Sequence, residues 1–191
     1  MQYLLYLHGF HSSPYSEKAL LFTKHVKAHY PNIDVIAPQL PTKPKQVLEV
    51  LNELISKYDF QGVIGSSLGG FLATYLHNKI EKPIVLVNPA VKPFELLHDY
   101  LGPQTHPITS EQYELTEQDM TELKQLYQPE LKARSQVWLL QQEKDEVLDY
   151  REALEKYQGC KISFELGGDH SFVGFDRYLT QIVEFFDLGK R

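Results

Sequence analysis

The sequence predicts a doubly wound α/β domain, in which helices cover both sides of a mostly parallel sheet of about six strands. Short apolar runs alternate along the chain with segments that have the apolar spacing of amphipathic helices. Small and polar residues directly follow several of these runs, at the strand ends where open α/β sheets bind ligands. A length of 191 residues suffices for one substantial core, so residues 1–191 are expected to form a single domain.

The first part of the chain predicts two strands and two helices. Residues 3–7 are almost entirely apolar, as in a strand buried on both faces, and His8-Gly9-Phe10 follows directly. Ser13-Pro14 predicts a helix start with proline at the first helical position, and a short strand is expected at residues 35–37. A second helix is expected over residues 44–58. The predicted apolar faces consist of Ala19, Phe22, Val26 and Tyr30 in the first helix, and Val47, Leu51, Leu54, Ile55 and Tyr58 in the second.

The remainder of the chain predicts further strands and helices in alternation. The expected strands lie at the start of residues 62–70 and at residues 84–87, 137–140 and 162–166; the expected helices lie at residues 71–76, 150–157 and a C-terminal stretch with Phe175, Leu179, Ile182 and Phe186. Residues 162–166 alternate between apolar and polar, which is typical of an edge strand covered on one face.

The segment between the strands at 84–87 and 137–140 interrupts this alternation. Residues 91–134 are polar and punctuated by proline, with no strand pattern and a helical pattern over residues 116–127. An insertion of this size between two strands is usually a cap or lid. A helical cap is therefore expected here, with a surface elaboration that plays no part in substrate choice as the alternative.

One short stretch carries the first chemical signal. Gly65-x-Ser67-x-Gly69 fits a nucleophile elbow, in which a serine lies on a sharp turn from a strand into a helix. The glycines leave room for the close approach of strand and helix. The pattern alone is equally compatible with tight packing, although its glycine spacing argues against a dinucleotide-binding loop. Ser67, rather than its neighbour Ser66, is the candidate nucleophile.

Two later strand ends supply the partners that a serine nucleophile requires, a base and an acid to orient it. Asp145 follows the strand at 137–140 and His170 follows the last strand, in the order serine, acid, histidine of this arrangement. Other acids near Asp145 that remain alternatives are Glu143, Glu146 and Asp149.

The oxyanion of the reaction would be bound by two backbone N–H groups, those of Leu68 and Phe10. His8, next to Gly9, fits the loop that shapes this oxyanion site. The other histidines within predicted helices are explained by exposure to solvent: His25, His29 and His77. No spacing typical of a metal site is found, and neither a metal nor a cofactor is expected.

Composition narrows the partners and the location. A net charge of -6 gives no reason to expect nucleic acid or an anionic membrane surface. The single cysteine, Cys160, excludes an internal disulfide framework. No apolar stretch is long enough to cross a bilayer and no signal peptide precedes residue 3, so a cytoplasmic location is expected. The oligomeric state stays open.

Motifs along nearly the whole chain resemble those of the YqiA-type small bacterial esterases (the YqiA/YcfP group) of the α/β-hydrolase superfamily. The matching stretches are Tyr6–Phe10 with Ser12–Pro14, Pro38–Pro41, Gly65–Gly70, Val87–Val91 with Pro93–Leu97, Trp138–Gln142, Asp145–Tyr150 and His170. The resemblance implies a compact three-layer α/β-hydrolase fold and a hydrolase of carboxylic esters or acyl thioesters, with Ser67, Asp145 and His170 as its triad. Lys144 and Asp169, where glycine and asparagine are expected, depart from the pattern.

The leading hypothesis is therefore a serine esterase or thioesterase that acts on a small-molecule acyl substrate. The alternatives are a non-catalytic binding module on the same fold, and a serine peptidase or C–C hydrolase. Candidate substrate-pocket residues are Phe10, Tyr100, Tyr113 and Leu115.

Overall fold

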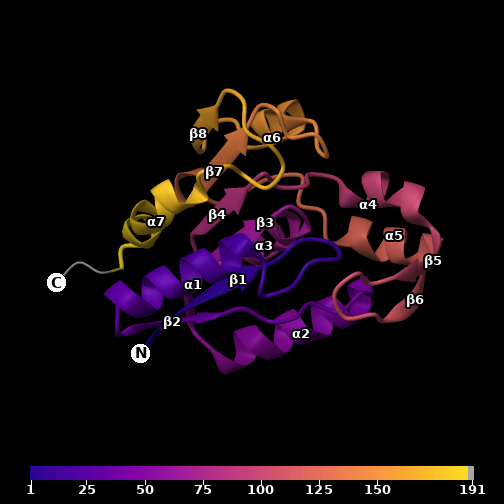
Figure 1. Cartoon of the computed structure of the whole chain (residues 1–191), viewed down its shortest axis with the longest axis horizontal. Helices are drawn as coiled ribbons and strands as arrows, with labels where there is room; N and C mark the ends of the chain where they lie inside the picture. Colours follow the sequence, from indigo (N-terminus) through magenta and orange to yellow (C-terminus); the bar gives the residue numbers. More distant parts are fainter. Residues whose placement is uncertain (189–191) are drawn as a thin grey trace.

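The computed structural model describes residues 1–188, in which six parallel strands form one sheet in the order β2-β1-β3-β4-β7-β8 (Figure 1). The strands are β1 (Gln2–Leu7), β2 (Ile33–Ile36), β3 (Phe60–Ser66), β4 (Ile84–Val87), β7 (Val137–Gln142) and β8 (Lys161–Glu165). The main helices are α1 (Glu17–His29), α2 (Pro44–Lys57), α3 (Leu68–Ile80), α6 (Tyr150–Lys156) and α7 (Leu179–Phe185), the last entered through the 3-10 turn η3 (Phe175–Tyr178).

Helices cover both faces of the sheet because successive strand residues point to opposite sides. In β1, Leu4 and Tyr6 pack with α1 and α7, whereas Leu5 and Leu7 pack with α2, α3 and α6. The predicted doubly wound architecture is confirmed, and every strand pair in the sheet is parallel. β8 is an edge strand, as predicted from its alternating pattern.

The strand order explains where the candidate site lies. The chain passes from β1 outward to β2 and then returns to the other side of β1 as β3. The loops after β1 and β3 therefore leave the sheet in opposite directions, and this switch point is where open α/β sheets bind ligands. Gly9 and Phe10 follow β1 there, and Ser67 follows β3.

Residues 91–134 contain a feature that the sequence did not predict. Besides α4 (Pro93–Leu96), the 3-10 turn η1 (Leu97–Tyr100) and α5 (Glu117–Gln125), an antiparallel hairpin is formed by β5 (Gly102–Thr105) and β6 (Gln112–Leu115). Each strand has four residues and β5 includes a proline, so neither shows a readable alternation. The expectation of no strand in this segment was wrong. α5 packs on α2. The hairpin lies beside the end of the sheet from which the loops after β1 and β3 emerge (Figure 1).

Several element boundaries also differ from prediction, and α3 extends beyond the expected residues 71–76 in both directions. α1 begins at Glu17 and not at Pro14, because the hydroxyl of Ser13 accepts the N–H of Tyr15 in a turn before the helix. β2 begins and ends slightly before the predicted range, at Ile33 and Ile36. Within residues 1–188, no helix is both long and apolar enough to span a membrane.

Candidate active site

Ser67 lies between β3 and α3 with φ 54° and ψ −121°, a left-handed backbone conformation that is strained for a residue with a side chain. The neighbouring glycines permit this turn. A Cβ on Gly65 would lie 2.1 Å from the carbonyl oxygen of Gly69, and one on Gly69 would lie 2.0 Å from that of Leu7. Ser67 is half-buried, whereas Ser66 is buried. The turn therefore presents Ser67 and not Ser66.

Main-chain hydrogen bonds hold this serine. Its N–H donates to the carbonyl of Val87 at 3.2 Å, and its own carbonyl accepts the N–H groups of Gly70 and Ala90 at 2.9 Å each. Val87 is the last residue of β4. The position of Ser67 is thus tied to the end of the adjacent strand.

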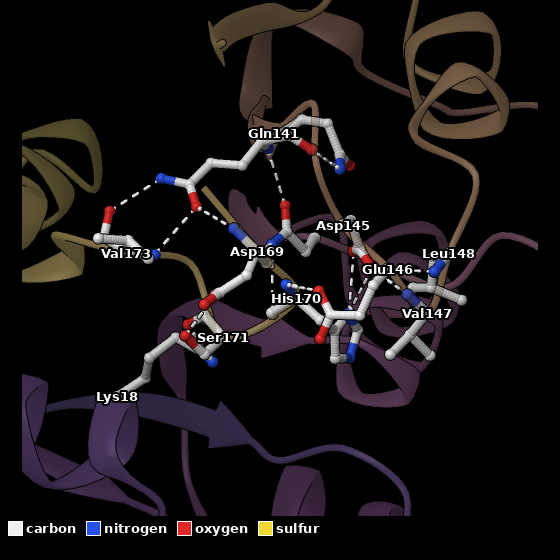
Figure 2. Close-up of polar contacts among 12 residues, drawn as sticks. Lys18, Gln141, Asp145, Glu146, Val147, Leu148, Asp169, His170, Ser171 and Val173 are labelled. Carbon is white, nitrogen blue, oxygen red and sulfur yellow. Dashed lines mark hydrogen bonds and ion pairs between the residues drawn. The ribbon is translucent and has the colours of Figure 1, made fainter. Parts of the chain in front are cut away.

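A histidine and a carboxylate meet beside the ends of β7 and β8 (Figure 2). Nδ1 of His170 lies 2.8 Å from Oδ2 and 2.9 Å from Oδ1 of Asp145. The Asp145 side chain is completely buried and its Oδ1 also accepts the N–H groups of Val147 and Leu148. Because Nδ1 faces the carboxylate, Nε2 is the nitrogen that is left for a second partner.

The three acids that were alternatives to Asp145 make other contacts. Glu146 accepts the backbone N–H of His170 at 2.9 Å, and Glu143 accepts that of Gly167 at 3.2 Å. Asp149 caps α6 through the N–H of Arg151 and pairs with its guanidinium, which holds the pKa of Asp149 below its usual value. Among these four acids, Asp145 is the one that contacts the His170 ring.

Asn88 joins the His170 loop to the sheet and was not predicted as a site residue. It is fully buried with φ 40°, and its Nδ2 donates to the carbonyls of Asp169 at 2.9 Å and His170 at 3.2 Å. Its Oδ1 accepts the N–H of Gln142 at 2.9 Å. Asn88, directly after β4, therefore connects the strand adjacent to the elbow with the histidine loop.

Gln142 and Glu165 form a second tier of support for this loop. Oε1 of Gln142 accepts the N–H groups of Asp169 at 3.2 Å and Val173 at 2.9 Å, and its Nε2 donates to Glu165 at 2.8 Å. Hydrogen bonds from Arg177, Tyr178 and Gln142 lower the pKa of Glu165 to about 2. This carboxylate therefore stays ionised and keeps accepting from Gln142 at neutral pH.

The two backbone groups expected to bind an oxyanion are available. Leu68 is the first residue of α3, so its N–H has no acceptor within the helix. Within the described part of the chain, the N–H of Phe10 also has no acceptor. Gly9 brings this loop against the serine, since a Cβ there would lie 3.1 Å from Cβ and 3.6 Å from Oγ of Ser67.

A largely aliphatic pocket adjoins this site. Its walls come from the loop after β1, the loop before α2, the start of α3 and the 91–134 segment. Of the candidate pocket residues, Phe10, Tyr113 and Leu115 line it. Tyr100 lies outside its lining, is exposed, and meets the Phe10 ring edge-on with 5.8 Å between ring centroids.

Two other histidines have structural surroundings. His8 donates from Nδ1 to the carbonyl of Gly9 at 2.8 Å and accepts the N–H of Leu40 at Nε2 at 2.9 Å, and burial lowers its pKa. His77 was expected to be exposed, which was wrong. It is fully buried, with Nδ1 2.8 Å from the carbonyl of Lys82, because α3 is covered on several sides and not on one stripe.

The structure thus brings Asp145 and His170 into contact and places Gly9 beside Ser67. Within residues 1–188, the Ser67 hydroxyl makes no hydrogen bond. The backbone of Ser67 is connected to the His170 loop through Val87 and its neighbour Asn88. Nor is any group of three or more His, Cys, Asp or Glu arranged there to hold a metal ion. The polar residues that sequence reasoning missed, Asn88 and Gln142, follow or end buried strands, and that position was the one signal that pointed to them.

The family model described as uncharacterised protein family UPF0227 matches residues 3–187. The chain belongs to UPF0227. This match confirms the resemblance to the YqiA family that the motifs carried. The UPF0227 chain is also similar in structure to proteins with which it shares less than a fifth of its residues, so these likenesses bear on the fold alone.

A candidate hydrolase from Agrobacterium vitis S4 is 18% identical, with a TM-score of 0.74 over 97% of this chain and 88% of that one. Mouse alpha/beta hydrolase domain-containing protein 10 is 14% identical, with a TM-score of 0.73 over 97% and 89% of the two chains. The esterase domain of a Rhodothermus marinus protein is 15% identical, with a TM-score of 0.63 over 95% and 82%. The UPF0227 chain therefore has the α/β-hydrolase fold.

Proposed function

We propose that this chain is a serine hydrolase that cleaves carboxylic esters, with acyl thioesters as related substrates. The observation that carries the proposal is the 2.8 Å contact between His170 Nδ1 and a buried carboxylate of Asp145, near a serine in a strained elbow. Such an ion pair fixes the tautomer of a histidine and stabilises the imidazolium that forms when it accepts a proton. A hydrolase fold and an esterase among the structural neighbours agree with this chemistry.

In the proposed reaction, Nε2 of His170 takes the proton of the Ser67 hydroxyl as Oγ attacks the ester carbonyl carbon. The oxyanion that develops accepts hydrogen bonds from the N–H groups of Phe10 and Leu68. His170 then gives the proton to the departing alkoxide, which leaves an acyl group on Ser67. The same histidine activates water, the acyl-enzyme is cleaved, and the acid product leaves. Each step uses groups of this chain and water, so the proposal requires no cofactor.

We also infer that the 91–134 segment covers the substrate as a cap. Four contacts with the β1–α1 and β2–α2 loops hold this segment in place. Lys43 pairs with Asp119 at 2.5 Å and donates to the carbonyl of Glu114 at 2.7 Å; Thr42 donates to Glu111 at 3.0 Å; and His11 lies 2.6 Å from the Tyr113 hydroxyl. Four leucines of the segment line the pocket: Leu97, Leu115, Leu123 and Leu126. The alternative, a surface elaboration, would leave these contacts without a role in substrate choice.

The test is hydrolysis of a nitrophenyl acyl ester by Ser67→Ala, with Ser66→Ala as a matched control one residue away. Ser67→Ala is expected to lower kcat by at least about 10³-fold while unfolding at the same urea concentration as the wild type. Ser66→Ala should keep most of the activity. A fluorophosphonate probe should label Ser67 in the wild type.

Full hydrolysis by Ser67→Ala would overturn the assignment of the nucleophile. Failure of the wild type both to cleave esters and to react with the probe would favour the non-catalytic binding module. Cleavage of peptides or of carbon–carbon bonds in preference to esters would favour the remaining alternatives on this fold.

A further inference from the structure

The pocket beside the elbow contains polar groups among its leucines, and not all of them are paired. Four aromatic side chains with polar atoms line it, His8, His11, His106 and Tyr113, beside Thr42, whose hydroxyl donates to Glu111. Because buried N–H and O–H groups in proteins are nearly always hydrogen-bonded, an unpaired one in an apolar pocket points to a ligand. Each of the four can be assessed from its contacts.

His8 has no free ring nitrogen for a ligand. Its Nδ1–H donates to the carbonyl of Gly9, and its Nε2 accepts the N–H of Leu40. Both ring nitrogens are used within the chain, so His8 is a structural part of the pocket wall.

A single hydrogen bond joins His11 to Tyr113. Nε2 of His11 lies 2.6 Å from the Tyr113 hydroxyl. Burial raises the pKa of Tyr113 to about 12, and burial together with the nearby His106 lowers the pKa of His11. The imidazole is therefore neutral, and its bond to the phenol ties the loop after β1 to strand β6. Nδ1 of His11 has no hydrogen-bond partner among the described residues, but this side chain is only half-buried, unlike that of His106.

His106 differs from both. It lies in the turn of the β5–β6 hairpin, where it is only 3% exposed, and its Nδ1 accepts the N–H groups of Ile108 and Thr109 at 3.2 Å each. A nitrogen that accepts two N–H groups carries no proton, so the ring is neutral with its proton on Nε2. Among the described residues, this Nε2–H has no acceptor.

We propose that the pocket binds the acyl group of the substrate, and that this acyl group carries an uncharged oxygen, keto or hydroxyl, which accepts the Nε2–H of His106. The inference rests on the proposed serine hydrolase and adds the class of its substrate. The pocket is lined by Phe10 and Leu68, whose N–H groups would hold the carbonyl oxygen of the ester, so the adjoining acyl chain enters it. The leucines contact the chain, and the buried donor on His106 selects an oxygen on it.

The charges around the pocket favour an uncharged oxygen over a carboxylate. The nearby cation, Lys43, is already paired with Asp119 and bonded to the carbonyl of Glu114. The histidines that line the pocket are neutral donors and acceptors, so none of them supplies a positive charge. A buried carboxylate without a cationic partner is strongly unfavourable.

The test compares nitrophenyl hexanoate with nitrophenyl 4-oxohexanoate and 5-oxohexanoate, so that only the acyl group changes. For each enzyme, the ratio of kcat/KM for an oxo ester to that for hexanoate is measured, and each ester is corrected for its own rate with hydroxide. In the wild type, one of the oxo esters is expected to be preferred. In His106→Phe this preference should fall by about fivefold to tenfold, the usual effect of losing one hydrogen bond to an uncharged acceptor.

The hexanoate rate serves as an internal control for the hairpin turn, because a purely structural role of His106 would affect all three esters equally. Thr109→Ala perturbs the same turn and should keep the wild-type preference. Tyr113→Phe removes the hydroxyl that is bonded to His11 and should also keep the preference, since the donor assigned to the substrate is on His106.

An unchanged preference in His106→Phe overturns the inference, and so does a preference lost in Tyr113→Phe instead. If the wild type cleaves hexanoate through Ser67 but prefers neither oxo ester, the inference fails while the proposed function stands. If Ser67→Ala cleaves hexanoate as fast as the wild type, the proposed function fails and this inference fails with it.

Discussion

The elbow and the loop that carries His170 lie at the same end of the sheet, but they are held in different ways. At the elbow, main-chain hydrogen bonds and direct contact between backbones position Ser67, and Gly65 and Gly69 have no room for a Cβ. The His170 loop leaves an edge strand, where few backbone partners exist. Side chains hold it instead, chiefly the amides of Asn88 and Gln142.

The difference shows which changes each region tolerates. A region packed backbone against backbone excludes added volume, whatever the chemistry of the added group. A region held by side-chain amides accepts a change of shape more readily than the loss of a donor, because an unpaired buried carbonyl or N–H is costly. Three substitutions test this contrast, in order of decreasing effect.

Gly69→Ala tests the elbow and should have the largest effect. Its new Cβ would meet the carbonyl oxygen of Leu7 at 2.0 Å, so we expect the free energy of unfolding to fall by about 3 kcal/mol in urea denaturation. In a helix, replacing glycine by alanine is normally stabilising, so a loss of stability here would be specific to the clash. Gly159→Ala is the control. It has φ 81° and ordinary contacts, and should lose about 1 kcal/mol. Equal losses would contradict the steric account.

Asn88→Asp tests the loop. Aspartate tolerates the same left-handed backbone and keeps an acceptor for Gln142, but it turns an oxygen toward the carbonyls of Asp169 and His170. We expect kcat for a nitrophenyl ester to fall by about 10²-fold as His170 shifts, with a smaller change in KM.

Asn78→Asp is the matched control for this substitution. Its amide likewise donates twice, to Gln128 and the carbonyl of Glu130, and accepts the N–H of Lys132, but it lies away from the His170 loop. Its kcat should stay near the wild-type value. An equal loss of kcat in both variants would show that the Asn88 effect is general destabilisation.

Glu165→Gln tests the second tier of the loop and should have the smallest effect. The folded pKa of Glu165 is about 2, below that of an unfolded glutamate, so its contribution to stability is complete above about pH 4.3 and is lost as the pH falls toward 2. We expect the variant to be less stable than the wild type by roughly 1 to 3 kcal/mol at pH 7, with the difference shrinking from pH 5 to pH 2. Urea denaturation across this range measures it, with the exposed Glu53→Gln as control. A difference that does not depend on pH would contradict the ion-pair explanation.

The strands and their alternation with helices could be predicted from the sequence. A short apolar run of the sheet interior indicates a strand whatever segments later pack against it. The spacing of Gly65, Ser67 and Gly69 likewise indicated the turn, since its sterics are local. The β5–β6 hairpin could not be predicted, because two strands of four residues pair through contacts rather than through a pattern of their own. The burial of His77 was missed for a related reason: a helical spacing does not say how many neighbours cover the helix.

In the candidate site, too, local features were readable from the sequence and contacts between distant segments were not. By itself, the sequence determined that a serine, an acid and a histidine follow strands in the order of this chemistry, and that Ser67 occupies the elbow. Only the tertiary structure decided that Asp145, and not Glu143, Glu146 or Asp149, contacts His170, and that Asn88 holds the loop. It alone decided that His106 keeps a free donor beside a pocket of leucines. The physical reason is that a buried polar group is defined by its partners, and these come from segments that lie far apart along the chain.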